Sequence, residues 1–328
     1  MEYSSFDLRE YLDFNLHFCR EIKPDLGEDS FAHGFCADAG ILAVFDGCGG
    51  LGAQTRQAYS NKTEAYMASR MVSGAVCDWF ADVFPLPGGY TGSDKLVPGL
   101  RERYIDPVLQ TFQAGTEGGF RIKGTMSRVL PTTMAMALVQ SMKGSKLSIT
   151  CVWAGDSRVY ILTPTGLAQL TPDDCTQPDP MENLYNDGIL TNVLSADGRY
   201  ELRAAEFAVH SPCVVLSATD GCFGYLFSPM EFEGLLLSTL MEAGSPSQWE
   251  FMMAEAMGAV AGDDYTLELA SFGFGSYQAL QGAFRSRYDI LCAQYLKPME
   301  ALDPGDRMGR TELWQHYRSG YLRYMGGV

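Results

Sequence analysis

Residues 147–170 read LSITCVWAGDSRVYILTPTGLAQL, and this stretch decides the fold class of the chain. It contains three largely apolar runs, the first two with β-branched residues, separated only by short turns with Gly, Asp or Pro. The runs are 147–153, 158–162 and 167–170, and the turns are 155–157 and 164–166. Antiparallel strands can be joined by such short turns, whereas parallel strands need a crossover of a dozen or more residues. The spacing therefore predicts an antiparallel meander.

Apolar runs of the same kind recur along the chain, at 41–45 (ILAVF), 134–139, 213–218 and 265–270. Two longer segments differ from them: residues 54–84 contain no Pro, and residues 100–114 repeat apolar residues near helical spacing. We predict strands in the runs, helices in the two longer segments, and a Gly/Pro-rich surface loop at 85–99. Strands in groups with long helices inserted between them favour an α+β sandwich over a parallel βαβ fold.

Residues 171–200 are polar, contain prolines and lack periodicity, although strand-like groups flank them. We expect them to form a lobe or flap.

The C-terminal part of the chain has a different character. Residues 276–328 carry seven Lys/Arg and five Asp/Glu, whereas the whole chain has 24 and 40. Apolar and aromatic residues recur there at spacings of three and four, in two stripes. The stripes are Tyr277, Leu280, Phe284, Tyr288, Leu291 and Tyr295, and then Trp314, Tyr317, Tyr321 and Tyr324. We predict a main domain at 1–272 and a helical extension at 273–328. Packing on the domain is favoured over the alternative, a docking surface for a partner protein.

The composition limits the classes of function. The chain has 328 residues and a formal net charge of −16, which argues against binding to nucleic acid because phosphates would be repelled. The start, MEYSSFDLREYLDF, lacks a basic region followed by an apolar one, and no apolar run approaches the length of a membrane span. Nine cysteines occur without a C-x-x-C pair. We expect a cytoplasmic protein with no membrane partner.

Acidic residues stand at the ends of several apolar runs. Asp46 follows ILAVF, Asp156 follows ITCVWAG, Asp220 follows CVVLSAT, and Asp263 precedes DYTLELA, while Glu28-Asp29 lies upstream. One Asp-Gly at a strand end is an ordinary turn. Several strand ends that meet at one edge of a sheet bring carboxylates together, and these repel one another unless a cation neutralises them. Ligation by oxygen atoms alone suits Mg²⁺ or Mn²⁺. Such ions would also supply the positive charge that a phosphate ester needs and this acidic chain lacks.

Seven segments in order carry a resemblance to a known family. They are GEDS (27–30), VFDGCGG (44–50), PTTMAMAL (131–138), AGDSRVYIL (154–162), LTPDD (170–174), SATDG (217–221) and GDDYTLELA (262–270). The chain resembles the type 2C (PPM) metal-dependent protein phosphatases, and is closer to their bacterial branch, over roughly residues 10–272. The resemblance implies an α+β, four-layer α-β-β-α sandwich: two antiparallel sheets packed face to face and flanked by helices. It also implies hydrolysis of phosphoserine and phosphothreonine in proteins by a hydroxide that bridges two Mn²⁺ or Mg²⁺ ions, without a phosphoenzyme.

The resemblance also implies which residues hold the ions. Asp46 would bridge both, and the carbonyl of Gly47 would complete the second. Asp220 and Asp263 would bind the first. A phosphorylated protein is then the expected substrate.

Further positions match family residues that act less directly at the metal centre. Glu28 would reach the second ion directly or through water, and Asp29 would orient a water. Asp156 matches the position that holds a third, weaker ion together with Asp220 in some members. Thr132 and Thr133 match a Gly-Ser/Thr-Thr segment with a packing or backbone role.

The chain departs from the family pattern in three places. The family's phosphate-binding Arg, four residues before the acid, is Pro24 here, and the neighbouring Lys23 is the candidate phosphate contact. Lysine lacks the bidentate fork of arginine, so weaker phosphate binding is expected. Cys48 replaces the His of DGHGG and is expected to be a small packing residue. Asp264 stands where Asn is common and adds a negative charge.

Three other functions compete with this interpretation. Residues 47–52 form a G-x-G-x-x-G, but Asp46 would place a carboxylate beside the pyrophosphate of a dinucleotide. A cysteine-based phosphatase needs C-x₅-R, which no cysteine here provides. A catalytically weak, phosphatase-like scaffold or binding module, acting through its C-terminal helical extension, is the alternative from another class. Retention of Asp46, Asp220 and Asp263 argues against it.

Overall fold

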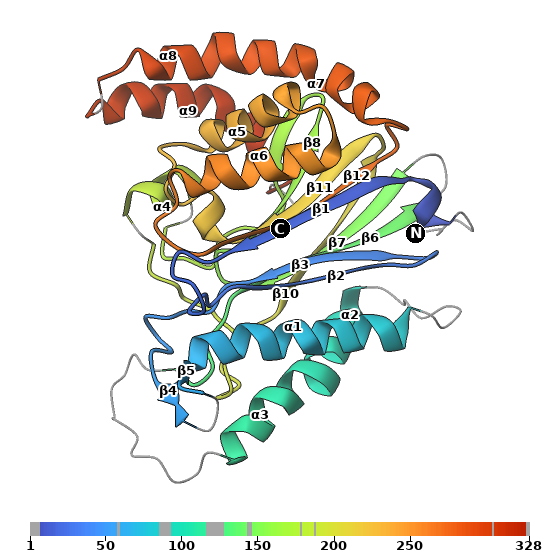
Figure 1. The fold of residues 1–328 in the computed structure, drawn as a ribbon, viewed down its shortest axis with the longest axis vertical. Coiled ribbons are helices and arrows are strands. Elements are labelled where there is room, and N and C mark those ends of the chain that lie inside the picture. Colours follow the sequence, from blue (N-terminus) through green and yellow to red (C-terminus); the bar gives the residue numbers. More distant parts are fainter. Residues whose placement is uncertain are drawn as a thin grey trace.

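The computed structural model describes residues 7–57, 60–84, 93–115, 128–142, 146–177, 179–186, 188–303 and 305–325. It contains two five-stranded sheets packed face to face (Figure 1). The first sheet has the order β1 (Leu12–Arg20), β12 (Tyr265–Phe272), β11 (Cys213–Ala218), β8 (Arg158–Thr163), β9 (Gly166–Gln169). The second has the order β10 (Arg203–His210), β7 (Lys146–Ala154), β6 (Met134–Met142), β3 (Gly40–Phe45), β2 (Ser30–Phe35). Every neighbouring pair in both sheets is antiparallel.

Helices cover the outer face of each sheet, so the molecule has four layers (Figure 1). On the second sheet lie α1 (Glu64–Val83), α2 (Ser93–Leu100) and α3 (Asp106–Gly115). On the first lie α5 (Pro229–Glu242) and α6 (Pro246–Gly258), with α7 (Tyr277–Leu291), α8 (Lys297–Glu300) and α9 (Arg307–Tyr321) beyond them. The predicted α+β sandwich is confirmed. None of the described helices is both long enough and apolar enough to cross a membrane.

Burial on both faces explains the apolar runs. All six residues of β3 and all eight of β12 are buried, because each strand has a sheet on one side and helices on the other. Ser228, Ser245 and Ser276 cap the N-termini of α5, α6 and α7, and Pro follows the first two of them at the first helical position. Local sequence signals and tertiary burial therefore agree.

The predicted meander is only half correct. β8 and β9 form a hairpin, but β7 and β8 lie in different sheets. The turn at 155–157 carries the chain across the sandwich instead of folding it back, and Gly155 has φ of +104°, which favours glycine. A Cβ on Gly155 would also lie 2.7 Å from the Thr133 side chain. The short turn at 155–157 excludes a helical crossover between β7 and β8, but its length does not determine whether these two strands pair with each other.

Two predicted boundaries were also wrong. Helix α1 begins at Glu64 rather than at residue 54, because β4 (Thr55–Arg56) and β5 (Lys62–Thr63) pair before it and Thr63 caps the helix. The second half of the predicted loop at 85–99 is α2, with Pro98 inside it, while residues 85–92 lie outside the described residues.

The predicted lobe at 171–200 contains α4 (Pro180–Asn186) and is tied to the body of the protein. Bridges join Cys175 to Leu190 and Thr132 to Leu194. The carboxylate of Asp174 accepts hydrogen bonds from Gly155 N–H (3.2 Å) and from the amide of Asn192 (2.6 Å). This segment therefore holds the turn that carries Asp156.

The aromatic stripe of the C-terminal extension packs inward, as favoured. Trp314, Tyr317 and Tyr321 are buried in the same hydrophobic cluster as α5, α6 and the first sheet. The Trp314 indole N–H donates to Asp179 of the lobe (3.1 Å). These three side chains are thus unavailable for docking, and a partner that binds another face of the extension remains a prediction. The division into 1–272 and 273–328 also stays a prediction.

Candidate metal centre

Three chain segments meet at one end of the sandwich and bring three aspartates together. Asp46 follows β3, Asp156 lies in the crossing turn between β7 and β8, and Asp220 follows β11. One carboxylate oxygen of each lies within 4.8 Å of one from each of the others. Both sheets contribute, so the cluster depends on the packing of one sheet against the other. All three residues keep partial exposure, which leaves the centre open to ions and water.

Two threonines fix the backbone of Asp46. Thr133 donates its N–H to the Asp46 carbonyl (2.8 Å), and the Thr132 hydroxyl donates to the same oxygen (2.8 Å). The Asp46 N–H in turn donates to Thr133 Oγ1 (3.2 Å). Both threonines are fully buried. This agrees with the backbone role expected for them.

Two glycines next to the aspartates allow neighbouring segments to approach closely. A Cβ on Gly47 would lie 2.6 Å from the Ala65 carbonyl oxygen, and one on Gly221 would lie 1.9 Å from the carbonyl oxygen of Asp264. Any side chain at either position would push these segments apart. Glycine is therefore required at both positions by packing.

The electrostatics of the cluster are governed by burial and by repulsion between like charges. Burial raises the pKa of both Asp46 and Asp156 well above the usual range, and repulsion from Asp220 raises each further. The Oδ1 atom of Asp156 is buried and has no hydrogen-bond partner among the described residues. Buried polar atoms normally have partners, so this oxygen fits a ligand for a cation.

Glu28 and Asp29 lie beside this cluster but are not among its three members. Asp29 is buried, and its Oδ2 accepts a hydrogen bond from the Thr219 hydroxyl (2.8 Å). Burial raises the pKa of Asp29 to about 8. Glu28 accepts a hydrogen bond from Thr63, and its pKa is also raised by burial. Their hydrogen bonds orient both carboxylates around the first three.

The loop before Glu28 is held by Asp264. Its Oδ1 accepts from Ile22 N–H (2.8 Å) and its Oδ2 from Glu28 N–H (2.7 Å). Both carboxylate oxygens are used, which an asparagine cannot match with its single carbonyl oxygen. The departure from Asn noted in the sequence therefore has a structural reason, one that the sequence did not reveal.

Asp263 and Lys23 lie near each other at the exposed rim. Burial of its carboxylate raises the pKa of Asp263, and the positive charge of Lys23 partly offsets that rise. Lys23 itself is exposed. Asp263 acts electrostatically on Asp46, although it is not one of the three residues whose oxygens cluster.

Cys48 has no sign of reactivity. Burial raises the pKa of its thiol well above the usual range, as does the nearby Asp46 carboxylate. Its N–H donates to the Pro131 carbonyl (3.2 Å). A thiol that stays protonated suits the packing role expected for it.

A cavity of about 320 Å³ adjoins the aspartates. Its lining includes Asp156, Asp220, Arg158, Asp173 and Tyr225. Arg158 is 2% exposed and makes a bidentate pair with Asp173, at 2.7 and 2.6 Å. Its charge is therefore already compensated by Asp173. Sequence reasoning quoted the segments of both residues and assigned neither a role, since nothing in the spacing links positions 158 and 173.

Thr63 and Thr219 were missed as well, because they contact the acidic residues from other elements. Thr219 directly precedes Asp220, the one signal that could have suggested it.

Solved structures share this fold at low sequence identity. The serine/threonine phosphatase Stp1 from Staphylococcus aureus superposes with a TM-score of 0.58 and 17% identity, over 83% of this chain and 97% of that one. The PPM Ser-Thr phosphatase MsPP from Mycobacterium smegmatis, solved with cacodylate, gives 0.55 and 13%, over 80% and 100%. The serine/threonine phosphatase PstP/Ppp from Mycobacterium tuberculosis gives 0.53 and 18%, over 79% and 97%. No protein-family model matches the sequence, and a comparison with curated proteins finds no similar one.

The chain therefore has the fold of the PPM-type serine/threonine phosphatases, and the resemblance is confirmed at that level.

Proposed function

We propose that the chain is a metal-dependent phosphatase that acts on phosphoserine and phosphothreonine in proteins. The observation that carries this proposal is the convergence of Asp46, Asp156 and Asp220, with one buried oxygen of Asp156 left without a partner among the described residues. Neutral hydrogen-bonding groups could have filled this place in a purely structural site. The fold, which solved serine/threonine phosphatases share, points the same way.

The residues fit two Mn²⁺ or Mg²⁺ ions, with a third, weaker site. Asp46 would bridge the two ions, the Gly47 carbonyl and Glu28 would serve one, and Asp220 and Asp263 the other. Asp29 would orient water, and Asp156 with Asp220 would form the weaker site. Ions of this kind neutralise phosphate charge and acidify a bound water.

The remaining residues position these ligands. Thr132 and Thr133 hold Asp46 in place, and Thr219 and Thr63 orient Asp29 and Glu28. Asp264 fixes the loop that carries Lys23. Lys23 is exposed beside Asp263, and we propose that its ammonium contacts the substrate phosphate. With a formal net charge of −16, the chain needs the ions before it can hold a phosphate ester.

Hydrolysis of a phosphothreonine peptide and of a small aryl phosphate tests the proposal. The assay is run with EDTA, Mg²⁺ or Mn²⁺, for the wild type, Asp46→Asn and Asp38→Asn. Asp38 is the matched control, because it is exposed in the turn at the opposite end of the β2–β3 hairpin. We expect turnover that needs a metal, survives in Asp38→Asn and is lost in Asp46→Asn.

Metal binding without turnover by the folded wild type would contradict the proposal. It would instead support the scaffold function, for which the absence of an arginine at Pro24 is the specific observation. Lys23→Ala refines the test: a raised KM at unchanged metal affinity is expected if the ammonium contacts phosphate.

A further inference from the structure

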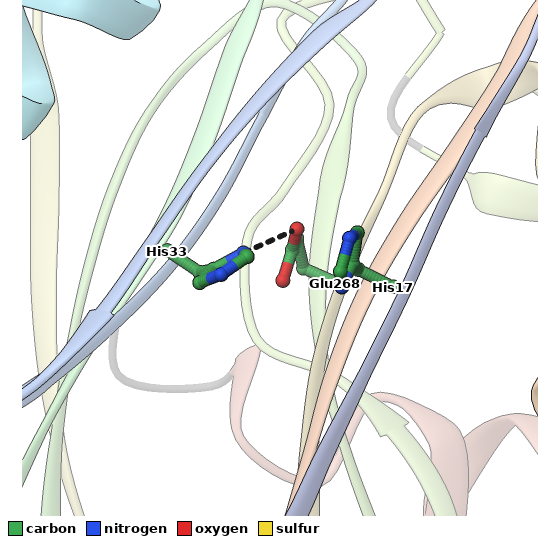
Figure 2. A group of neighbouring side chains, drawn as sticks. All are labelled: His17, His33 and Glu268. Atoms are coloured by element: carbon green, nitrogen blue, oxygen red, sulfur yellow. Dashed lines mark hydrogen bonds and ion pairs between the residues drawn. The ribbon is translucent and has the colours of Figure 1, made fainter. Parts of the chain in front are cut away.

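Two histidines and one glutamate form a second cluster of ligand-type side chains, away from the strand ends. His17 lies on β1, His33 on β2 and Glu268 on β12. His17 is directly opposite Glu268 in the register of the first sheet, and β2 is the edge strand of the second sheet. Figure 2 shows the Glu268 carboxylate beside the two imidazole rings, whose centroids are 4.9 Å apart. One ligand atom from each residue lies within 4.8 Å of one from each of the others.

Glu268 is buried, yet only one of its oxygens has a partner. Its side chain is 0% exposed, and Oε1 is 3.2 Å from His33 Nδ1. Oε2 is buried and has no hydrogen-bond partner within the described part of the chain. The hydroxyl of Ser217, opposite Glu268 on β11, donates instead to the Leu42 carbonyl (3.0 Å). A buried carboxylate with one unsatisfied oxygen is costly, and a cation beside it would remove that cost.

The geometry is close to that of a small tetrahedral site. Zinc binds nitrogen at about 2.0–2.1 Å, so neighbouring ligand atoms in a tetrahedron lie about 3.3 Å apart. The 3.2 Å between His33 Nδ1 and Glu268 Oε1 already matches this spacing, and one ligand atom from each of the three residues lies within 4.8 Å of the others. Phe31 packs against both imidazoles, at 5.1 Å from His17 and 5.8 Å from His33 between ring centroids. The His33 side chain is 32% exposed, which leaves access for an ion and for a water as fourth ligand.

We propose that His17, His33 and Glu268 bind a transition-metal ion of the zinc class. Two imidazoles and one carboxylate suit Zn²⁺, whereas the oxygen ligands of the acidic centre suit Mg²⁺ or Mn²⁺. The two sites therefore differ in the metal they select. This proposal does not depend on phosphatase activity.

Occupancy would join the two sheets. His17 and Glu268 belong to the first sheet and His33 to the second, so the ion would clamp the edge strands together. Strand β2 begins directly after Asp29, and β12 begins directly after Asp264. An ion at this position would thus stabilise the strands that lead into the acidic centre, and we expect a higher unfolding temperature in its presence.

Zinc titration of metal-free protein tests the proposal, with Co²⁺ as the spectroscopic probe of four-coordinate geometry. Saturating Mg²⁺ and the Asp46→Asn background keep the acidic centre from contributing. The chain has four histidines, and the two outside the cluster, His210 and His316, are exposed. The double variant His210→Gln/His316→Gln is therefore the matched control for His17→Gln/His33→Gln.

We expect one Zn²⁺ to bind in the background and in the control, with a rise in unfolding temperature. The affinity should fall about 100-fold or more in His17→Gln/His33→Gln, since even a residue that only supports a ligand is worth 10- to 100-fold. Glu268→Gln, which keeps the side-chain shape, should lose affinity too and gives a second test if the double variant does not fold. Equal zinc affinity in the histidine variant and its control, or no zinc binding by the folded background protein, would overturn the proposal.

Discussion

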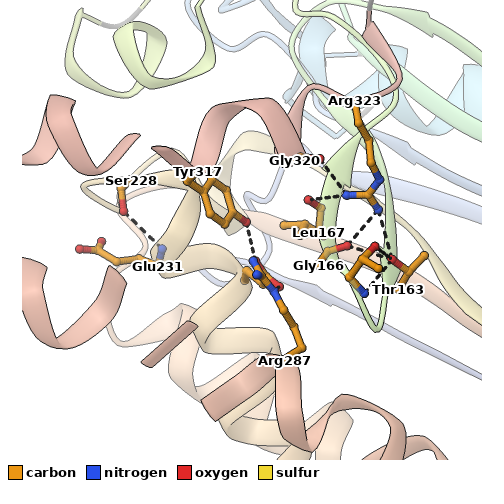
Figure 3. Close-up of polar contacts among 11 residues, drawn as sticks. Thr163, Gly166, Leu167, Ser228, Glu231, Arg287, Tyr317, Gly320 and Arg323 are labelled. Atoms are coloured by element: carbon orange, nitrogen blue, oxygen red, sulfur yellow. Dashed lines mark hydrogen bonds and ion pairs between the residues drawn. The ribbon is translucent and has the colours of Figure 1, made fainter. Parts of the chain in front are cut away.

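Two regions of this protein bury charge, and they do so in opposite ways. At the strand ends, carboxylate oxygens of Asp46, Asp156 and Asp220 lie within 4.8 Å of one another. Beneath the C-terminal helices, Glu233 of α5 is 0% exposed but fully compensated. Arg287 donates to both of its oxygens at 2.7 Å, and the Tyr317 hydroxyl donates to Oε2 at 2.5 Å. Figure 3 shows that the side chains of Arg287 and Tyr317 point toward one another.

This difference distinguishes a candidate ligand-binding site, the aspartate cluster, from a structural ion pair, Glu233–Arg287. The ion pair of Glu233 with Arg287, together with the Tyr317 hydroxyl, fixes how α7 and α9 pack on α5. Both carboxylate oxygens of Glu233 are already hydrogen-bonded, so they are not available to a ligand. Clustered carboxylates raise one another's pKa and weaken the fold, and an external cation relieves both effects. Substitutions in the two regions should therefore act on different properties, the first on activity and the second on stability.

The largest effect is expected from Asp46→Asn. Hydrolysis should fall about 1,000-fold or more, equivalent to about 4 kcal/mol in activation free energy, because the proposed bridging ligand is lost. The free energy of unfolding in EDTA should stay equal or rise, since one repelling carboxylate is gone. Kinetics and urea unfolding of the same preparation measure both. A large loss of stability in EDTA would contradict the view that this charge is uncompensated.

Glu233→Gln should have the reverse profile. It leaves the Arg287 charge buried without a counter-charge, and we expect a loss of about 3 kcal/mol in unfolding free energy. The rate per folded molecule should not change. Glu242→Gln is the control, because Glu242 is exposed on the same helix. If both variants unfold at the wild-type urea concentration, the pair does not support the packing of the extension.

A smaller effect is expected from Asp264→Asn. The amide replaces one of two acceptors for Ile22 and Glu28 N–H, which should cost about 1.5 kcal/mol in stability. Because the same loop carries Glu28 and Lys23, metal affinity should fall and KM should rise. Wild-type metal affinity and KM in this variant would show that the loop does not need the second acceptor.

The smallest effect is expected from a change of pH on the free energy of unfolding. A carboxyl whose pKa is raised by folding holds its proton more tightly in the native state, so its contribution to stability is largest at low pH. That contribution is lost as pH rises towards the native pKa, which is about 8 for Asp29. In EDTA, the free energy of unfolding should fall by about 1 kcal/mol between pH 7 and pH 8.

Saturating Mg²⁺ should reduce the dependence of the unfolding free energy on pH. The Asp29→Asn substitution should reduce the same dependence when no metal is present. A stability in EDTA that rises over this interval would show that the carboxylates are compensated.

Much of the fold could be predicted because burial on both faces gives continuous apolar runs such as ILAVF at 41–45. The pairing of the strands could not be predicted, as the turn at 155–157 shows. A turn of three residues can reverse the chain within one sheet or carry it to the other sheet. Only packing decides between them, here the fit of Gly155 against Thr133. The start of α1 was misplaced because residues 54–63 contain no proline to interrupt a helix, although β4 and β5 pair there.

The acidic residues were predictable because each stands next to an apolar run. The residues that position them could not be predicted. Thr63 and Thr219 contact Glu28 and Asp29, and Arg158 contacts Asp173, only in the folded structure. The His17, His33 and Glu268 cluster left no trace in the sequence for the same reason, since its members lie on three strands and in two sheets.

A titration with Mn²⁺, followed by the electron paramagnetic resonance signal of the free ion, tests the nature of the strand-end cluster directly. We predict that the wild type and Asp38→Asn each bind two Mn²⁺ ions, and that Asp46→Asn binds neither tightly, because one carboxylate serves both. Circular dichroism confirms that each protein is folded. Equal binding by Asp46→Asn and the wild type, or no binding by the folded wild type, would contradict the assignment of these carboxylates as metal ligands.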